Sequence, residues 1–188
     1  MEAPAITRYR RPFFAPLWLT MLAGALVLAA LTAFGFAMYR SAGSTIVMLM
    51  RPAEKDPGII ADPPLSPEGE ERAQRLAHLF GDGGTVAGLD AIYVSDDRRA
   101  QQTAAPLGQR LHRVPVTFGA AGVRATAARV LHDHTGEAVV VIAGGASFVQ
   151  MLRALGGEDL PGVQDDPDVI YVISLPRFGR ARLLRLRL

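Results

Sequence analysis

Two arginines of this chain follow short apolar segments, at positions where an arginine can bind an anion. Arg51 comes directly after TIVMLM, and Arg99 comes four residues after AIYVS. A third apolar segment, AVVVIA, is followed by Gly144 and Gly145. Guanidinium groups form charge-assisted, bidentate hydrogen bonds with phosphate, and the free N–H groups at the start of a helix attract anions. If the three segments end at one place, these residues predict a phosphate-sized pocket.

The three segments belong to a regular alternation of predicted strands and helices. Short apolar runs predict buried strands, whereas apolar residues at every third or fourth position predict helices. One helix has Ser66 as its expected N-cap, Pro67 at its first position and glutamates in its first turn. The expected helices are 67–81, 97–111, 123–132 and 148–155, and the expected strands are 45–50, 91–95, 115–118, 138–143, 169–175 and 181–188.

This alternation predicts the fold class. Fully apolar strands that alternate with helices are typical of α/β proteins, in which helices cover both faces of a mainly parallel sheet. We therefore expect a three-layer α/β/α fold with a mainly parallel sheet, closed by a hairpin of the last two strands. Ligands of such sheets bind beyond the carboxyl ends of the strands. The residues after 45–50, 91–95 and 138–143 are thus expected to meet in one crevice.

A long apolar stretch precedes the predicted domain. Residues 17–38 contain no charged side chain, and a helix of that length covers about 33 Å, enough to cross a hydrocarbon core of about 30 Å. Arg8, Arg10 and Arg11 precede the stretch, whereas Arg40 alone follows closely. This bias predicts a cytoplasmic N-terminus. We expect a single-pass protein of a bacterial inner membrane whose C-terminal domain lies outside the cytoplasm.

The expected organisation has four parts. They are a cytoplasmic N-terminal flank (1–16), a transmembrane anchor (17–39), a linker (40–44) and a globular domain (45–188). A cleaved signal peptide is the alternative to an anchor, with Gly35-Phe36-Ala37 as its cleavage site. The apolar regions of signal peptides run only about 7–15 residues, so the length of this stretch favours an uncleaved anchor.

The charge of the chain is unevenly distributed. A sequence pI near 9.4 on its own indicates nucleic-acid binding. However, residues 1–40 carry a net charge of +3 from four Arg and one Glu, and residues 41–188 carry −1 from 16 Lys and Arg and 17 Asp and Glu. A nearly neutral domain gives little electrostatic attraction for nucleic acid, so no such partner is expected. The chain has no Cys, which excludes disulfides, Cys-ligated metals and thiol catalysis.

Several motifs together resemble one protein family. In order they are TIVMLMRPAEK, DPPLSPEGEERAQRLAHLF, LDAIYVSDDRRAQQTAAPL, EAVVVIAGGASFVQMLRALGG and VIYVISLPRFGRARLLRLRL. Their order and spacing over residues 45–188 are similar to those of the histidine phosphatase (phosphoglycerate mutase-like) superfamily. SDDRRAQQTAAPL is the most specific motif, since it resembles the family's serine–arginine–threonine signature. The resemblance implies the family's fold and a phosphatase or phosphomutase ancestry, with Arg51 and Arg99 as phosphate-binding residues.

Two positions depart from the family's pattern. The family's phosphorylated histidine follows the first arginine, and that position is Pro52 in this chain. The family's second histidine follows the fourth strand, at a position that aligns best with Gly145, or with Gly144 by a shift of one residue. Neither proline nor glycine has a nucleophilic side chain. The chain therefore resembles a degenerate member that lacks both catalytic histidines, and we expect no catalytic residue at either position.

None of the chain's own histidines is expected to replace the two that are missing. They lie within or at the ends of predicted helices, away from the crevice: His78, His112, His132 and His134. The segment His132-Asp133-His134 has some likeness to a metal site, but at a helix end it is more typical of a polar surface cap. No metal and no cofactor are expected. The family's acidic proton donor matches no single residue, and Glu54 and Asp97 are the candidates.

Three functions remain open at this point. The favoured one is a membrane-anchored pseudophosphatase that binds a phosphorylated small molecule or a protein partner without turnover. The second is an active phosphatase on an envelope phosphate ester that uses a nucleophile other than histidine, with Ser95 and Ser147 as the hydroxyl candidates. The third is a structural or interaction subunit with a vestigial pocket, in which Arg51 and Arg99 are paired with carboxylates.

Overall fold

An apolar helix and a globular α/β unit make up the computed structural model of the chain. The structure describes residues 17–41, 43–58, 61–81, 88–156, 168–176 and 180–187. Two compact units are formed by residues 1–40 and 41–188, a division close to the predicted boundary between anchor and domain. The expected N-terminal flank, residues 1–16, lies outside the described residues.

Helix α1 (Leu17–Ser41) belongs to the first unit except for its last residue, and it spans the residues of the predicted anchor. Its segment Trp18–Phe36 has a mean hydropathy of 2.1 and none of it is buried within the protein. Burial inside the domain therefore does not explain the apolar surface of α1. The helix is long and apolar enough to cross a membrane, a property that signal sequences near an N-terminus share.

The second unit is built on one six-stranded sheet with the strand order β3-β2-β4-β1-β5-β6. The first four of these strands pair in parallel, and β5 is antiparallel to both of its neighbours. The prediction of a mainly parallel sheet closed by a hairpin is thus confirmed. The strands are β1 (Thr45–Met50), β2 (Ala91–Ser95), β3 (Val116–Phe118), β4 (Ala138–Ile142), β5 (Val169–Leu175) and β6 (Arg182–Arg187).

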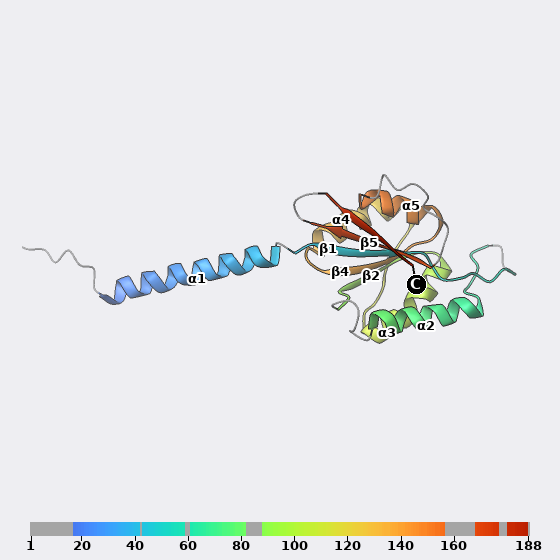
Figure 1. The fold of residues 1–188 in the computed structure, drawn as a ribbon, viewed down its shortest axis with the longest axis horizontal. Helices are drawn as coiled ribbons and strands as arrows, with labels where there is room; N and C mark the ends of the chain where they lie inside the picture. The colour runs from blue at the N-terminus through green and yellow to red at the C-terminus, as the bar shows by residue number, and fades with distance from the viewer. Residues whose placement is uncertain are drawn as a thin grey trace, which may run out of the picture. The chain divides into compact units, whose positions relative to one another are not determined.

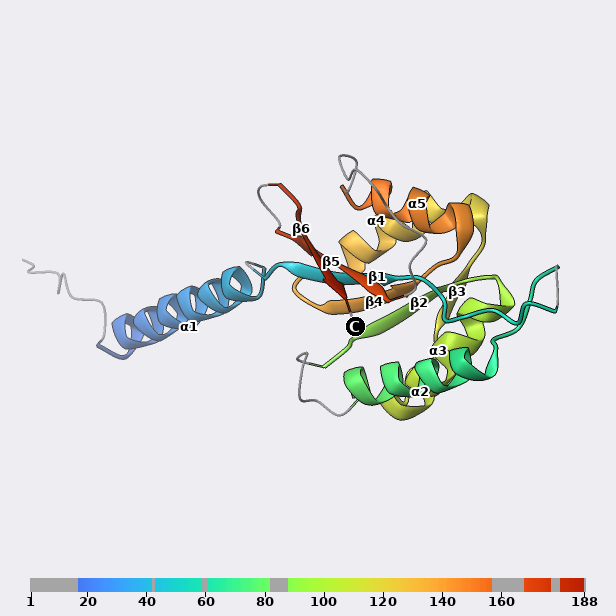
Figure 2. The same cartoon turned by 45° about the vertical axis from the view of Figure 1, so that its right-hand side comes forward.

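Helices cover both faces of this sheet, which confirms the predicted three layers (Figure 1, Figure 2). Helices α2 (Pro67–Gly81) and α3 (Arg98–Leu111) lie on one side, and α4 (Val123–Asp133) and α5 (Gly145–Ala154) lie on the other. A short 3₁₀ helix, η1 (Ala120–Gly122), precedes α4.

Helix α5 begins three residues earlier than the sequence predicts. Gly144 has an extended backbone and caps the helix, and its carbonyl oxygen accepts a hydrogen bond from the N–H of Phe148 at 3.3 Å. The helix therefore starts almost directly at the end of β4, which places its N-terminal turn beside the carboxyl ends of the strands.

The side chains of β1 alternate between two apolar cores. Val47 and Leu49 pack with residues of α4 and α5, whereas Met48 and Met50 pack with residues of α2 and α3. Because both faces of the central strands are buried, these strands have continuous apolar sequences instead of an alternating pattern.

The strand register places the carboxyl ends of β1, β2 and β4 side by side at one edge of the sheet. Ile142 of β4 pairs with Met50 of β1 on one side and with Val94 of β2 on the other. The chain therefore leaves the three strands close together, and the residues that follow them share one edge of the sheet.

The packing of α2 against the segment after β1 depends on Gly69. A Cβ at this position would lie 2.4 Å from the carbonyl oxygen of Glu54, a backbone atom that cannot rotate away. In an open helix, Gly→Ala stabilises by about 1 kcal/mol. Here we expect Gly69→Ala to destabilise the domain by about 1–3 kcal/mol, the usual cost of overpacking.

Thermal unfolding of the detergent-solubilised chain, followed by circular dichroism, measures this effect. Gly122→Ala is the control, because nothing lies within 4 Å of the Cβ that it adds, and its melting temperature should hardly change. A Gly69→Ala protein as stable as the parent would contradict the close approach of α2.

Candidate functional site

The residues that follow β1 and β4, together with the first turn of α3, line one cavity of about 370 Å³. The described residues around it are Arg51, Pro52, Ala53, Glu54, Lys55, Arg99, Gly144 and Gly145. The structure thus brings together the two arginines and the glycine pair that the sequence analysis selected. The cavity has the size of a small-molecule site.

Arg51 lies in the wall of the cavity against an aromatic ring. Its guanidinium carbon is 4.4 Å from the centroid of the Phe148 ring, a cation–π distance. Phe148 belongs to α5 and is fully buried, so the ring gives the guanidinium a rigid support. The sequence analysis did not identify Phe148, since only the packing of α5 against β1 brings the two residues together.

Arg99 and Thr103 of α3 hold the segment after β1 in place. The N–H of Ala53 donates to the Thr103 hydroxyl at 3.0 Å, and this hydroxyl donates to the carbonyl oxygen of Arg99 at 2.8 Å. Arg99 Nη1 lies 3.4 Å from the carbonyl oxygen of Ala53. In the described part of the chain, Arg99 forms no ion pair with a carboxylate.

The carboxylate in the wall of the cavity is bound by an arginine of α2. Arg72 Nη1 donates to Glu54 Oε1 at 3.1 Å, and the Arg72 side chain is almost completely buried. The same nitrogen also contacts the Asp168 carboxylate at the start of β5. Glu54, one of the two expected candidates for a proton donor, therefore forms an ion pair with Arg72 of α2.

Ser95 and Asp97 join the end of β2 to the end of β4. The Ser95 hydroxyl donates to the Asp97 carboxylate and accepts from the N–H of Gly144 at 3.2 Å. Asp97 also caps α3, because it accepts from the N–H of Ala100 at 2.9 Å. Ser95 is only 1% exposed. It therefore acts as a structural link here, and Asp97, the other candidate for a proton donor, serves as a helix cap.

The backbone distinguishes the two glycines that the sequence analysis considered for the position of the family's second histidine. Gly145 has φ +50°, in the left-handed region that other residues rarely adopt, whereas Gly144 has φ −100° and ψ 163°. A histidine thus fits the backbone better at Gly144, the alternative alignment, than at Gly145. A Cβ at Gly144 would lie 3.1 Å from Asp97 Oδ2, so that carboxylate would have to move by a few tenths of an ångström.

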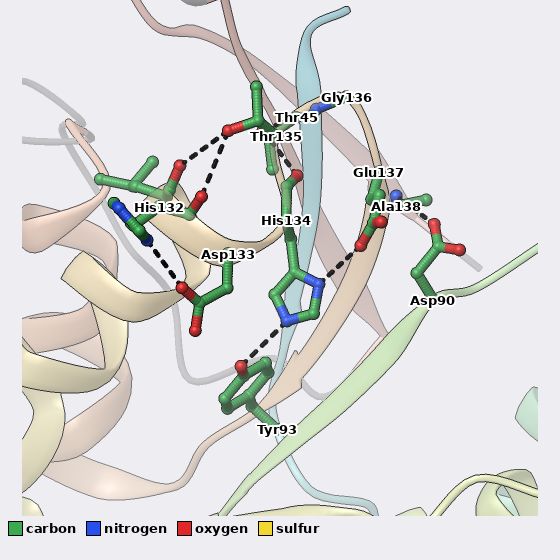
Figure 3. A network of polar contacts seen from close by, with 11 residues as sticks. Thr45, Asp90, Tyr93, His132, Asp133, His134, Thr135, Gly136, Glu137 and Ala138 are labelled. Carbon is green, nitrogen blue, oxygen red and sulfur yellow. Dashed lines mark hydrogen bonds and ion pairs between the residues drawn. The ribbon is translucent and has the colours of Figure 1, made fainter. Parts of the chain in front are cut away.

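Two of the chain's histidines lie in a polar cluster just before β4 (Figure 3). The cavity lies at the opposite end of that strand, where Gly144 and Gly145 follow it. His134 contacts Glu137 Oε2 through Nδ1 at 2.7 Å and the Tyr93 hydroxyl through Nε2 at 3.0 Å. His132 Nδ1 instead contacts the neighbouring Asp133 carboxylate at 2.7 Å. The two imidazoles make separate local contacts, as Figure 3 shows.

The other two histidines also lie outside the cavity lining. His78 is in the last turn of α2 and His112 follows the last turn of α3. All four histidines therefore lie outside the described lining of the cavity. Within the described ranges, no group of three or more His, Cys, Asp or Glu residues is arranged to hold a metal ion.

Comparison with known proteins identifies the fold. The family model of the histidine phosphatase superfamily (branch 1) matches residues 51–121. A putative alpha-ribazole-5'-P phosphatase from Escherichia coli superposes with a TM-score of 0.63 at 16% identity, covering 78% of this chain and 97% of its own. The protein histidine phosphatase SixA, solved with tungstate, gives 0.59 at 18% identity, with 76% and 96% covered.

A putative phosphohistidine phosphatase SixA from Agrobacterium tumefaciens is similar at 23% identity, with a TM-score of 0.55 and 77% and 99% of the two chains covered. No curated protein sequence gives a significant match. The family match over residues 51–121 and the shared fold confirm the resemblance to the histidine phosphatase superfamily stated above. At the two positions where the resemblance leads us to expect histidines, the sequence has Pro52 and the pair Gly144–Gly145.

The polar cluster before β4 predicts a loss of stability at high pH. Burial raises the pKa of Tyr93, and the negative charge of Asp133 adds to the increase. The folded state therefore favours the neutral phenol. This contribution to stability is complete below the usual tyrosine pKa of about 10 and is lost as the pH rises above it.

We expect the melting temperature to fall as the pH rises above about 10, and Tyr93→Phe to reduce the steepness of that fall. The Tyr93→Phe protein also loses a hydrogen bond to His134, so each protein is compared with its own melting temperature at pH 8. Parallel pH curves for the two proteins would show that Tyr93 is not responsible.

Proposed function

We propose that this protein is a membrane-anchored pseudophosphatase, whose domain binds a phosphorylated ligand at Arg51 and Arg99 without hydrolysing it through a histidine. One observation carries the proposal: the cavity combines two arginines with the start of α5, yet has Pro52 where the family has its nucleophile. The ligand is a phosphorylated small molecule or a phosphorylated segment of a protein partner.

The charges around the cavity support anion binding. Arg99 has no carboxylate partner among the described residues, and Glu54 is bound by Arg72. The N-terminal turn of α5 adds backbone N–H groups, which favour an anion at this edge of the sheet. Carboxylates paired with both arginines would instead favour the third function considered above, a vestigial pocket.

The side chains around the cavity argue against turnover. Phosphoryl transfer to an enzyme needs a nucleophile in line with the phosphorus atom. No described residue of the cavity lining is a histidine, and Ser95 is buried with its hydroxyl engaged by Asp97 and Gly144. The second function, hydrolysis by a different nucleophile, therefore finds no support at Ser95.

The membrane anchor is the second part of the proposal. Helix α1 has the length and hydropathy of a span, and the arginines before it favour an N-terminus in the cytoplasm and a domain on the opposite side. An uncleaved α1 would restrict ligand binding to the membrane surface.

Ligand binding is tested by thermal shift with phosphate and vanadate. A ligand at ten times its Kd stabilises the folded state by about 1.4 kcal/mol, equivalent to a rise of about 4 °C in the melting temperature of a domain of this size. We expect such a rise for the detergent-solubilised parent chain. We expect none for Arg99→Ala, because that variant removes one of the two guanidinium groups.

Arg98→Ala is the matched control, because its backbone N–H bonds to Asp62 and its side chain is not part of the cavity lining. It should keep the shift seen in the parent. If millimolar phosphate and vanadate leave the melting temperature of the parent unchanged, the pocket is vestigial and the third function is favoured.

The absence of turnover is tested with an aryl phosphate substrate. The parent chain should release no more product than buffer. Turnover that survives repurification and disappears with Arg51→Ala would contradict the proposal that the protein binds its ligand without hydrolysing it.

Restoring the missing histidines is the converse experiment. We expect measurable hydrolysis from Pro52→His combined with Gly144→His, because the backbone at Gly144 accepts a side chain. Pro52→His combined with Gly145→His should be less active and less stable, since a non-glycine residue at φ +50° is strained. Equal activity of both double variants would show that the backbone does not decide the position.

A further inference from the structure

Strand β6 forms an exposed basic and apolar edge of the sheet. No described strand pairs with it on the side away from β5, and Figure 2 shows it at the end of the sheet. Residues 180–187, RARLLRLR, contain four Arg and three Leu and no acidic residue. All four arginines are exposed. This edge therefore concentrates positive charge on a domain whose net charge is −1.

An apolar strip lies beside these arginines. Leu184 and Leu186 are 57% and 43% exposed and lie opposite Val172 and Ile170 of β5. Paired residues point to the same side of a sheet, so the two leucines share the face that α2 and α3 cover. The apolar cluster under those helices includes β1, β2, β4 and Ile170 but no residue of β6. Leu184 and Leu186 thus extend the apolar face of the sheet beyond the part that α2 and α3 cover.

The sheet register relates this strip to the start of β1. Thr45 pairs with Leu175, and the preceding residue of β5, Ser174, pairs with Arg182. Two inter-strand spacings, about 10 Å, thus separate the first residues of β1 and β6. Only three residues separate Thr45 from Ser41, the last residue of α1, and four peptide steps span at most about 14 Å.

We infer that the strip formed by Arg180, Arg182, Leu184 and Leu186 binds the surface of an anionic lipid bilayer. The inference rests on the proposed anchor, which would hold the start of β1 close to the headgroups. Arginine binds lipid phosphates through its guanidinium, and leucine enters the boundary between headgroups and acyl chains. Each arginine at such a surface raises the bound population about fivefold, equivalent to about 1 kcal/mol.

The charge of the strip favours an anionic bilayer over a second copy of the chain as its binding partner. If the β6 edges of two copies paired antiparallel about their centres, Arg182 of one would lie opposite Arg187 of the other. Like charges directly opposite each other destabilise a strand pair. A negatively charged bilayer instead complements every charge of the strip.

The absence of Cys permits a site-specific test on the full chain. Leu184→Cys, labelled with an environment-sensitive fluorophore, reports on the strip. Val114→Cys, at an 89% exposed position before the opposite edge strand β3, is the matched control. Each protein is inserted into lipid nanodiscs of phosphatidylglycerol or of phosphatidylcholine, in samples that hold either one copy or two copies per disc. Both leaflets of a disc carry the same lipid, so the orientation of α1 does not affect the result.

We expect the label at position 184 to be quenched by nitroxide lipids in phosphatidylglycerol discs and much less in phosphatidylcholine discs, whereas the label at 114 is quenched in neither. Arg180→Gln with Arg182→Gln should weaken the quenching, and 0.5 M salt should do the same. Arg124→Gln with Arg153→Gln removes the same charge from α4 and α5 and should leave the quenching unchanged.

Three results would overturn the inference. The first is equal quenching of both labels, and the second is quenching that does not depend on lipid charge. The third is an apolar environment of the fluorophore at position 184 that occurs only in discs with two copies of the chain. A chain that fails to enter the discs would overturn it together with the anchor. Vanadate binding by the same samples reports separately on Arg99, so failure of the strip and failure of the phosphate pocket are distinguishable.

Discussion

The pairing of β4 between β1 and β2 is the constraint on which the candidate site depends. Ile142 is bonded into both neighbouring strands at one level, opposite Met50 and Val94. As a result, residues about fifty positions apart in sequence leave the sheet side by side. Thr103 and Ser95 then fix these segments to one another through hydrogen bonds to Ala53 and Gly144. The cavity is therefore a product of sheet topology, and it does not require the histidines that enzymes of the superfamily use.

The contacts described for the two arginines of the cavity do not involve the side chain at position 52. Arg51 is supported by a buried aromatic ring, and Arg99 contacts the backbone beside Pro52. Both contacts would persist in a domain that never forms a phosphohistidine. Pro52 itself is buried and lies between Arg51 and Ala53, two residues held by other elements.

Much of this arrangement was predictable from the sequence, because it depends on local patterns. Apolar runs indicated the central strands, and parallel topology then implied that Arg51 and the glycine pair meet. Other features depend on contacts between distant segments and have no local pattern. Examples are the Phe148 ring behind Arg51, the pairing of Glu54 with Arg72 and the left-handed backbone of Gly145. The early start of α5 was missed for a related reason, since two glycines indicate a turn unless the strand end that they cap is known.

The position of β1 within the sheet also has a mechanical consequence. The apolar helix α1 continues, after three residues, into the strand that pairs with β4 on one side and β5 on the other. Any force transmitted along α1 therefore enters the domain at an interior strand, where two rows of hydrogen bonds share the load. A connection to β3 or β6 would instead load a single row, which can be peeled open one bond at a time. The fold thus joins its N-terminal helix to one of its most resistant strands.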